Sequence, residues 1–232
     1  HYRVGMSNLG FQFLYALLNA HPDVVCERAF LPEPELLGEH RRTNTPLLSL
    51  ESSRPVNQFH VLAFSLPFEN DYPNLLKMLE LGRVPLLSAE RGPHDPLVVA
   101  GGAAVTMNPE PLAPFLDCVL VGEGEELIDD FLHALKRRWD SPREELLKGL
   151  AQVDGVYVPS LYEARWNDDG TLREISPLGD VPSKVRRRWL KEMAASAIAS
   201  SPLVTPHGEF GNTVLIEIGR GCPYRCRFCA VR

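Results

Sequence analysis

Three closely spaced cysteines form the residue pattern with the clearest chemistry in this chain. Cys222, Cys226 and Cys229 follow the spacing C-x3-C-x2-C, so three thiols lie on one short loop. Thiolates at this spacing can bind three irons of a cubane [4Fe–4S] cluster and leave the fourth iron without a protein ligand. A small molecule can coordinate that open iron, and we therefore predict these cysteines as metal ligands.

Two other uses of the three thiols remain open. A structural zinc site takes four nitrogen or sulfur ligands, and the nearest further candidate is His207, upstream of the cysteines. Disulfides within the group would leave one thiol over, and no feature of the sequence indicates secretion. The spacing favours the cluster over both alternatives.

The cysteine motif resembles the signature of the radical S-adenosylmethionine (SAM) superfamily. That signature has an aromatic residue before its third cysteine, and Phe228 stands at this position. The resemblance implies a [4Fe–4S] cluster that chelates SAM at its open iron and cleaves it reductively to start radical chemistry. It also implies that Phe228 packs beside the cluster and SAM, and that a donor such as flavodoxin or ferredoxin supplies the electron.

The residues before the motif suggest how it is positioned. Residues 213–219 alternate apolar and polar side chains as a strand does, and Gly219 to Gly221 then release the chain into the loop. In barrels of alternating strands and helices, reactive groups lie at the carboxyl ends of the strands. We therefore expect 213–232 to begin a radical SAM barrel, in an amino-terminal fragment that is inactive alone.

Composition limits the class of protein. The 232 residues carry 24 basic and 30 acidic side chains, a net charge of −6, which argues against a general nucleic-acid surface. The one basic run, at 184–191, is typical of a solvated helix face, although it could contact phosphates. Neither an apolar stretch of ~20 residues nor a signal peptide is present, so we expect no membrane partner and a cytoplasmic protein with reduced thiols.

Apolar runs and helical periodicities alternate over residues 1–140 and predict an α/β fold with a doubly wound, mostly parallel, Rossmann-like sheet. The predicted strands are 23–31, 60–68, 97–102 and 117–122, and the predicted helices are 7–20, 72–81 and 123–138. The first strand would close a β-α-β unit that begins at the amino terminus.

The pattern changes after residue 140. Residues 141–193 predict a small α+β extension with a helix at 142–150, a short strand at 156–159 and a hairpin around the turn at 167–170. Residues 194–212 have the serine, proline and glycine content of a linker. The barrel start at 213–232 follows.

Three loops of the α/β domain are candidate ligand sites, because ligands of doubly wound sheets lie beyond the carboxyl ends of the strands. Glycine is also common at strand-to-helix turns whatever a fold binds, so a purely structural role stays open. The candidate cofactor-binding residues are Ser7, Asn8, Gly101, Gly102, Gly122, Glu123 and Gly124.

Segments 99–102, 108–111 and 119–125 together look like the cobalamin (B12)-binding-type domain found ahead of many radical SAM cores, and 2–10 looks like an uncharacterised subgroup. The resemblance implies cobalamin as an optional cofactor and methyl transfer as one reaction. The Asp-x-His-x-x-Gly motif that supplies a histidine to cobalt is absent. Cobalamin would therefore have to bind without a histidine ligand to its cobalt.

Two alternative functions remain. The tRNA-modifying methylthiotransferases also place an α/β domain before a radical SAM barrel, but they need three cysteines there, and this domain has only Cys26 and Cys118. A non-enzymatic metal-binding or interaction module would use the three motif cysteines structurally. Nothing in the sequence selects a substrate.

Overall fold

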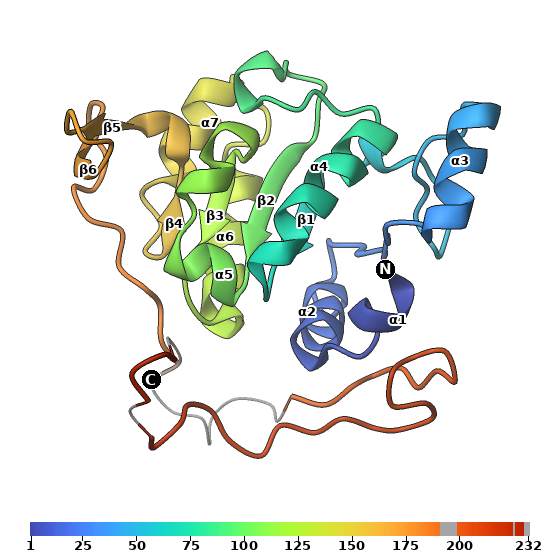
Figure 1. Cartoon of the computed structure of the whole chain (residues 1–232). Helices are drawn as coiled ribbons and strands as arrows, with labels where there is room; N and C mark the ends of the chain where they lie inside the picture. Colours follow the sequence, from blue (N-terminus) through green and yellow to red (C-terminus); the bar gives the residue numbers. More distant parts are fainter. Residues whose placement is uncertain (191–198, 225, 230–232) are drawn as a thin grey trace.

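The computed structural model describes residues 1–190, 199–224 and 226–229 (Figure 1). The strands are β1 (Val61–Ser65), β2 (Leu97–Gly101), β3 (Cys118–Leu120), β4 (Val156–Tyr157), β5 (Tyr162–Trp166) and β6 (Leu172–Pro177). The α-helices are α1 (Tyr2–Gly5), α2 (Leu9–Asn19), α3 (Pro34–Thr43), α4 (Tyr72–Leu81), α5 (Ala103–Met107), α6 (Gly124–Arg137) and α7 (Arg143–Leu150). Short 3-10 helices lie at Val56–Gln58, Glu69–Asp71, Ser88–Glu90, Glu110–Phe115 and Pro159–Leu161.

Four strands form one sheet in the order β1-β2-β3-β4. The first three run parallel, with Val61 opposite Leu97 and Val99 opposite Cys118, and β4 runs antiparallel to β3. The continuous apolar run of β2 suits a strand with both faces covered. The predicted α/β class with a mostly parallel sheet is confirmed, as is the separate antiparallel hairpin of β5 and β6.

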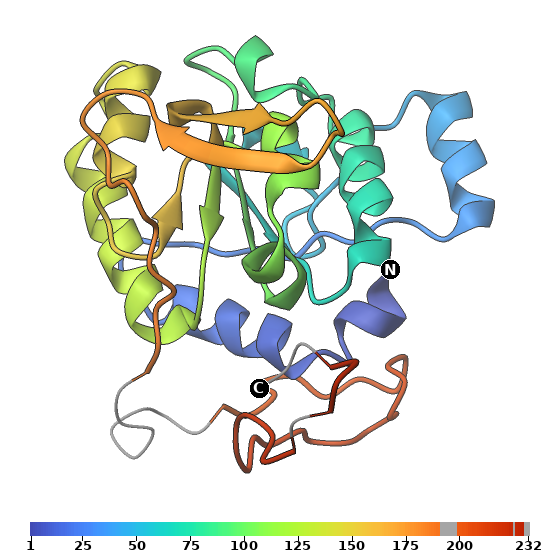
Figure 2. The same ribbon diagram turned by 60° about the vertical axis from the view of Figure 1, so that its left-hand side comes forward.

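Helices cover both faces of the sheet (Figures 1 and 2). Val99 and Cys118 belong to the core that α6 and α7 complete, and α2 packs against its rim. Val98 and Val119 belong to a second core, which Leu79 of α4 helps to fill. Because neighbouring strand residues point to opposite faces, the result is a three-layer α/β/α arrangement.

Helix α6 is the clearest case of sequence dictating structure. Acidic residues occupy its first turn, and Lys136 and Arg137 occupy its last, which complements the helix dipole. Burial of its apolar side chains stabilises the fold by roughly 1.5–3 kcal/mol for each large residue. Those buried residues are Leu127, Ile128, Phe131, Leu132 and Leu135.

The α/β unit continues past residue 140, the boundary expected from composition. Leu146 and Leu150 of α7 lie in the same core as α6. Strand β4 extends the sheet through the pairing of Val119 with Tyr157. The helix and short strand predicted after residue 140 are therefore parts of the main unit, and only the hairpin stands apart from the sheet.

The predicted strand at 23–31 is wrong, and with it the first β-α-β unit. Residues 24–33 have no regular secondary structure, and α1 occupies the start of the chain. The side chain of Asn19 bonds the backbone nitrogen and oxygen of Cys26, at 2.9 and 3.0 Å, in place of a neighbouring strand. Val24 and Val25 are the apolar pair that suggested a strand, and Val25 is 76 % exposed, so the two side chains are not both buried.

Two predictions nearer the cysteines are also wrong. Residues 213–219 make a single antiparallel bridge, between Ile216 and Ser200, instead of a strand. A strand needs neighbours on which to build a ladder, and one bridge supplies too few hydrogen bonds. The described part of the basic run, 184–190, is not helical, and Arg188 forms a parallel bridge with Gly122.

The strand order follows the chain order from β1 to β4. Among the strands that the structure describes there is thus no reversal of order, the feature that opens a ligand crevice in doubly wound sheets. Within the described helices, none is long and apolar enough to traverse a bilayer.

A buried ionic group holds the amino edge of the sheet. Asp117, one residue before β3, accepts hydrogen bonds from Arg91 Nη1 at 2.9 Å and from the backbone nitrogen of Val98 at 2.7 Å. Arg143 Nη2 lies 2.9 Å from the other carboxylate oxygen. Arg91 also donates to the carbonyls of Leu86 and Phe115, so one group connects four segments of the chain.

Candidate functional site

The cysteine loop lies at the surface. Cys222 and Cys226 are exposed and Cys229 is half-buried. The backbone nitrogen of Cys229 donates to the carbonyl of Cys226 at 3.2 Å, which closes a turn between the second and third cysteine. Gly221 adopts φ +78°, a left-handed conformation that glycine accepts readily, and so turns the chain into the loop.

The thiols of this loop match the ligands that iron–sulfur clusters take from proteins. In the part of the chain that the structure describes, no three His, Cys, Asp or Glu side chains are gathered closely enough to hold a metal ion. The donor set therefore fits a cluster by residue type and chain spacing, whereas the side chains must converge on binding. Their exposure leaves room for that movement.

Phe228 is 92 % exposed and Tyr224 is 72 % exposed. The aromatic ring before the third cysteine is thus presented to solvent, and apolar packing of these two rings contributes little to holding the loop. Its position next to Cys229 suits the packing role that the resemblance implies.

An ionic network connects the cysteine loop to the β3–α6 turn. Arg220, two residues before Cys222, pairs with Glu217 (Nε to Oε1, 2.7 Å). Its Nη1 lies 3.5 Å from Glu123 Oε2, and its Nη2 donates to Glu125. The hydrogen bond from Arg220 lowers the pKa of Glu217, and hydrogen bonds to Glu217 and Glu125 raise the pKa of Arg220, so the Arg220–Glu217 pair stays ionised over the physiological range.

Gly122 and Glu123 contact the chain's own backbone. Gly122 adopts φ +125°, and a Cβ atom there would lie 2.3 Å from the carbonyl oxygen of Arg188. The backbone nitrogen of Glu123 donates to the carbonyl oxygen of Arg188 at 3.1 Å. The carboxylate of Glu123 accepts a hydrogen bond from the backbone nitrogen of Leu190. A Cβ at Gly124 would meet the side chain of Leu14 at 2.9 Å. The glycines of this turn therefore permit close packing of segment 185–190 and α2.

Gly101 and Gly102 have a comparable role at the end of β2. Gly102 adopts φ +114°, and a Cβ there would lie 2.6 Å from the carbonyl oxygen of Leu66. The nitrogen of Leu66 donates to the carbonyl of Gly101 at 2.8 Å, and the nitrogen of Ala104 donates to that of Leu66 at 3.1 Å. The segment after β1 thus occupies the space that Gly102 provides, whereas a Cβ at Gly101 would make only ordinary contacts with Leu120.

Ser7 and Asn8 organise the amino-terminal helices. The side chain of Asn8 caps α2 by accepting from the nitrogen of Phe11 at 2.9 Å, a role for which asparagine is well suited. Ser7 Oγ donates to the carbonyl of Arg3 and accepts from the nitrogen of Glu209 at 2.6 Å. The structure therefore brings Ser7 into contact with the segment that leads to the cysteines.

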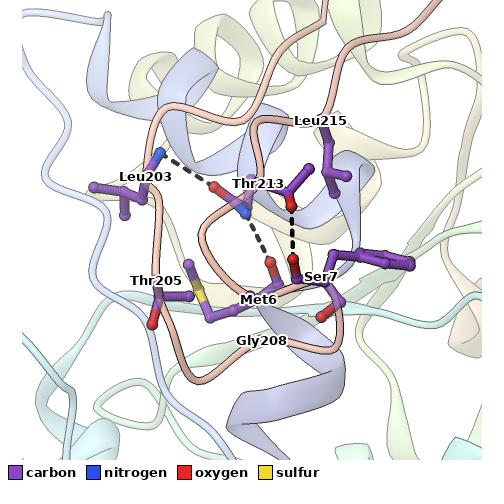
Figure 3. Close-up of a pocket in the computed structure, with 10 residues that line it drawn as sticks. Met6, Ser7, Leu203, Thr205, Gly208, Thr213 and Leu215 are labelled. Atoms are coloured by element: carbon purple, nitrogen blue, oxygen red, sulfur yellow. Dashed lines mark hydrogen bonds between the residues drawn. The ribbon is translucent and has the colours of Figure 1, made fainter.

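Figure 3 shows the small cavity, about 10 Å³, where that segment meets α2. Gln12, buried to 3 % exposure, donates to the carbonyl of Met6 at 2.7 Å and accepts from the nitrogen of Leu203 at 3.2 Å. Figure 2 shows residues 199–215 running beside α1 and α2. The cavity has room for about one water, and its importance is as a docking point for the chain before the cysteines.

Sequence reasoning missed Arg220 and Gln12. Arg220 stands beside the motif, and a charged residue between two glycines was a usable signal. Gln12 stands on the apolar face of a helix, where a polar residue indicates a buried hydrogen bond. Neither signal identifies the distant partner.

The two cysteines of the α/β unit are structural. Complete burial raises the pKa of the Cys118 thiol well above its usual range, and desolvation, followed by the charge of Glu51, raises the pKa of Cys26 to about 11. A metal ligand must be a thiolate, which both environments disfavour. They also lie apart from the motif cysteines, Cys118 on β3 and Cys26 after α2.

The amino-acid sequence is similar to one protein family and to two individual proteins. A family described as radical SAM proteins, N-terminal, matches residues 10–159, which span the α/β unit. An uncharacterised protein of Methanocaldococcus jannaschii is 29 % identical over 84 % of this chain and 35 % of its own length. The bacteriochlorophyllide d C-8(2)-methyltransferase of Chlorobaculum tepidum is 26 % identical over 57 % of this chain and 21 % of its own.

No solved structure matches the chain. The chain spans about a third or less of the length of these two relatives. Because the family model covers well over half of the 232 residues, the chain belongs to the family of radical SAM proteins, N-terminal.

Proposed function

We propose that this chain is part of a radical SAM enzyme in which Cys222, Cys226 and Cys229 hold three irons of a [4Fe–4S] cluster. The observation that carries the proposal is the exposed C-x3-C-x2-C loop, tied by Arg220 to an α/β unit of the radical SAM family. When bound, such a cluster with SAM supplies an electron that cleaves SAM reductively and yields a radical able to abstract hydrogen from a substrate.

The residues of this chain would bind and orient these groups. A reducing compartment such as the cytoplasm would keep the three thiols free of disulfides, and the thiols would lose their protons as they bind iron. Phe228 would cover one side of the cluster and SAM with its exposed ring. The exposure of the loop also suits electron transfer from a donor such as flavodoxin or ferredoxin, and we propose 213–232 as the start of the radical SAM core.

Methyl transfer is the reaction class that the comparisons favour. One relative is by name a methyltransferase, and its similarity covers 57 % of this chain. Its substrate is not carried over, because no described residue set of this chain selects a molecule of that kind. Methylthiotransferase chemistry is the weaker enzymatic candidate, since Cys26 and Cys118 offer no second set of thiolate ligands.

Cobalamin assistance fits the described residues poorly. Two of the candidate glycines lie instead against backbone of the same chain, Gly102 against Leu66 and Gly122 against Arg188. Cobalamin at this edge of the sheet would require segment 185–190 to leave Gly122. We therefore derive no step through cobalamin.

Anaerobic reconstitution of the full-length protein with iron and sulfide tests the proposal. We expect about four irons per chain, an iron–sulfur absorption band and, after reduction with dithionite, an electron paramagnetic resonance (EPR) spectrum that changes when SAM is added. The triple variant with Cys222, Cys226 and Cys229 replaced by alanine should bind no cluster, whereas Cys118→Ala should load normally. Stoichiometric zinc without iron would instead support the non-enzymatic metal-binding module and overturn the proposal.

A further inference from the structure

Arg220 occupies an unusual position, between two glycines and two residues before the first motif cysteine. Its guanidinium forms two hydrogen bonds with Glu217, at 2.7 and 2.9 Å. It also reaches two carboxylates of the β3–α6 turn, Glu123 and Glu125, which are far away in sequence. All four side chains are mostly shielded, with at most 24 % exposure.

The carboxylate side of this network belongs to the rigid part of the molecule. Glu125 lies in the first turn of α6, where the helix dipole favours negative charge. Glu123 also accepts from the backbone of Leu190, so its orientation is fixed from two directions. Helix α6 is buried along one side, and a contact with its first turn is therefore a contact with the core.

Four described side chains of the loop contribute little to holding it. Cys222 and Cys226 are exposed, and the rings of Tyr224 and Phe228 face solvent. A planar guanidinium that bonds carboxylates in several directions fixes orientation as well as distance, which the point charge of a lysine does not.

We propose that Arg220 is a positioning residue: it fixes the cysteine loop against the Glu123 and Glu125 side chains and so determines where a bound cluster lies relative to the α/β unit. The part of this inference that concerns the cluster rests on the proposed function. The part that concerns the loop does not, since it is argued from the ion pairs of Arg220 alone.

The first measurement is hydrogen exchange in the cluster-free, full-length protein. Arg220→Gln should raise amide exchange in 215–224 about tenfold, because the charged hydrogen bonds are lost and the bonded amides of this stretch, those of Leu215 and Glu217, then open more often. Glu125→Gln should loosen the same peptides while leaving the sequence of the loop intact. The double variant should be little worse than Arg220→Gln alone, because the contact between Arg220 and Glu125 is already lost in that variant.

Arg188→Gln is the matched control. Arg188 pairs with Glu126 and Asp130 further along the same helix, at 3.1 and 2.9 Å, and it lies in segment 185–190 instead of the cysteine loop. Exchange in 215–224 should stay at the wild-type rate in this variant. Wild-type exchange in Arg220→Gln, or an equal increase in Arg188→Gln, would refute the inference.

The second measurement is EPR of the reconstituted protein. Arg220→Gln should load iron as the wild type does, because its cysteines are intact, but the change in its spectrum on SAM addition should be weaker and broader. Arg220→Lys should restore the spectrum only in part. If the wild type binds no iron, the proposed function fails, but hydrogen exchange still tests the contact between Arg220 and the two glutamates. If the wild type loads and Arg220→Gln reproduces its spectrum with SAM, the positioning role fails.

Discussion

Replacing Asp117 tests how the sheet that carries the candidate site is held together. Its carboxylate is 1 % exposed and pairs with Arg91, whose side chain is 0 % exposed, at 2.9 Å. It also accepts from the backbone nitrogen of Val98. Asp117→Ala leaves a buried guanidinium without its counter-charge and a buried backbone donor without its acceptor. Removing one partner of such a pair costs about 3–5 kcal/mol of unfolding free energy.

Asp117→Asn separates the two contributions. The amide oxygen can still accept from the nitrogen of Val98, but the charge opposite Arg91 and Arg143 is gone. We expect a smaller loss than for alanine, about 1.5–3 kcal/mol, the range for hydrogen bonds to charged groups. Glu174→Gln is the control, because its pair with Arg165 lies on the exposed hairpin and contributes about 0–1 kcal/mol.

Urea unfolding of the chain, followed by circular dichroism, measures the three free energies of unfolding. The expected order of destabilisation is Asp117→Ala, then Asp117→Asn, then Glu174→Gln. An Asp117→Ala variant as stable as Glu174→Gln would refute the reasoning, because it would show that the buried pair contributes no more than a surface pair.

Three further predictions concern the thiols and the carboxyl edge of the sheet. Desolvation raises the pKa of Cys26 to about 11, so at pH 8 about one Cys26 thiol in a thousand is ionised. Iodoacetamide should therefore label the exposed Cys222 far faster than Cys26, as measured by mass spectrometry. Equal labelling of the two cysteines would contradict this. Gly122→Ala should cost about 1–3 kcal/mol of backbone strain and speed amide exchange in 185–190. The control Gly170→Ala, at φ +80° in open space, should leave exchange in 185–190 unchanged. Equal exchange rates in the two variants would contradict the close contact at Gly122. Hydroxocobalamin titrated into the full-length protein should show no shift in absorption; a saturable shift would show that segment 185–190 can leave this edge.

Local periodicity determined what the sequence could predict. Helix α4 runs over 72–81 as predicted, and α6 ends within a residue of its expected limit. The hairpin follows from the turn at 167–170, where Gly170 adopts φ +80°. In each case a few neighbouring residues carry the whole signal, so no knowledge of distant partners is required.

The failures have the opposite character. Residues 23–31 and 213–219 both alternate or cluster apolar side chains as strands do, yet a strand forms only where a neighbour completes its ladder. The side chain of Asn19 takes that place in the first segment, and a single bridge through Ser200 does so in the second. Sequence patterns report the propensity of one segment and contain no information about its partner.

The glycine loops show why a correct location can carry an incomplete interpretation. The sequence selects Gly102 and Gly122 because backbone must approach closely there, and the structure has close approach at both positions, by Leu66 and Arg188 of the same chain. Close approach does not say what approaches. At the neighbouring Glu123 the partner is Arg220, 97 residues away in number and two before Cys222. The edge of the sheet predicted to hold a cofactor therefore acts, in this structure, as the surface that receives the cysteine loop, and its connection with the chemistry runs through a guanidinium that no motif includes.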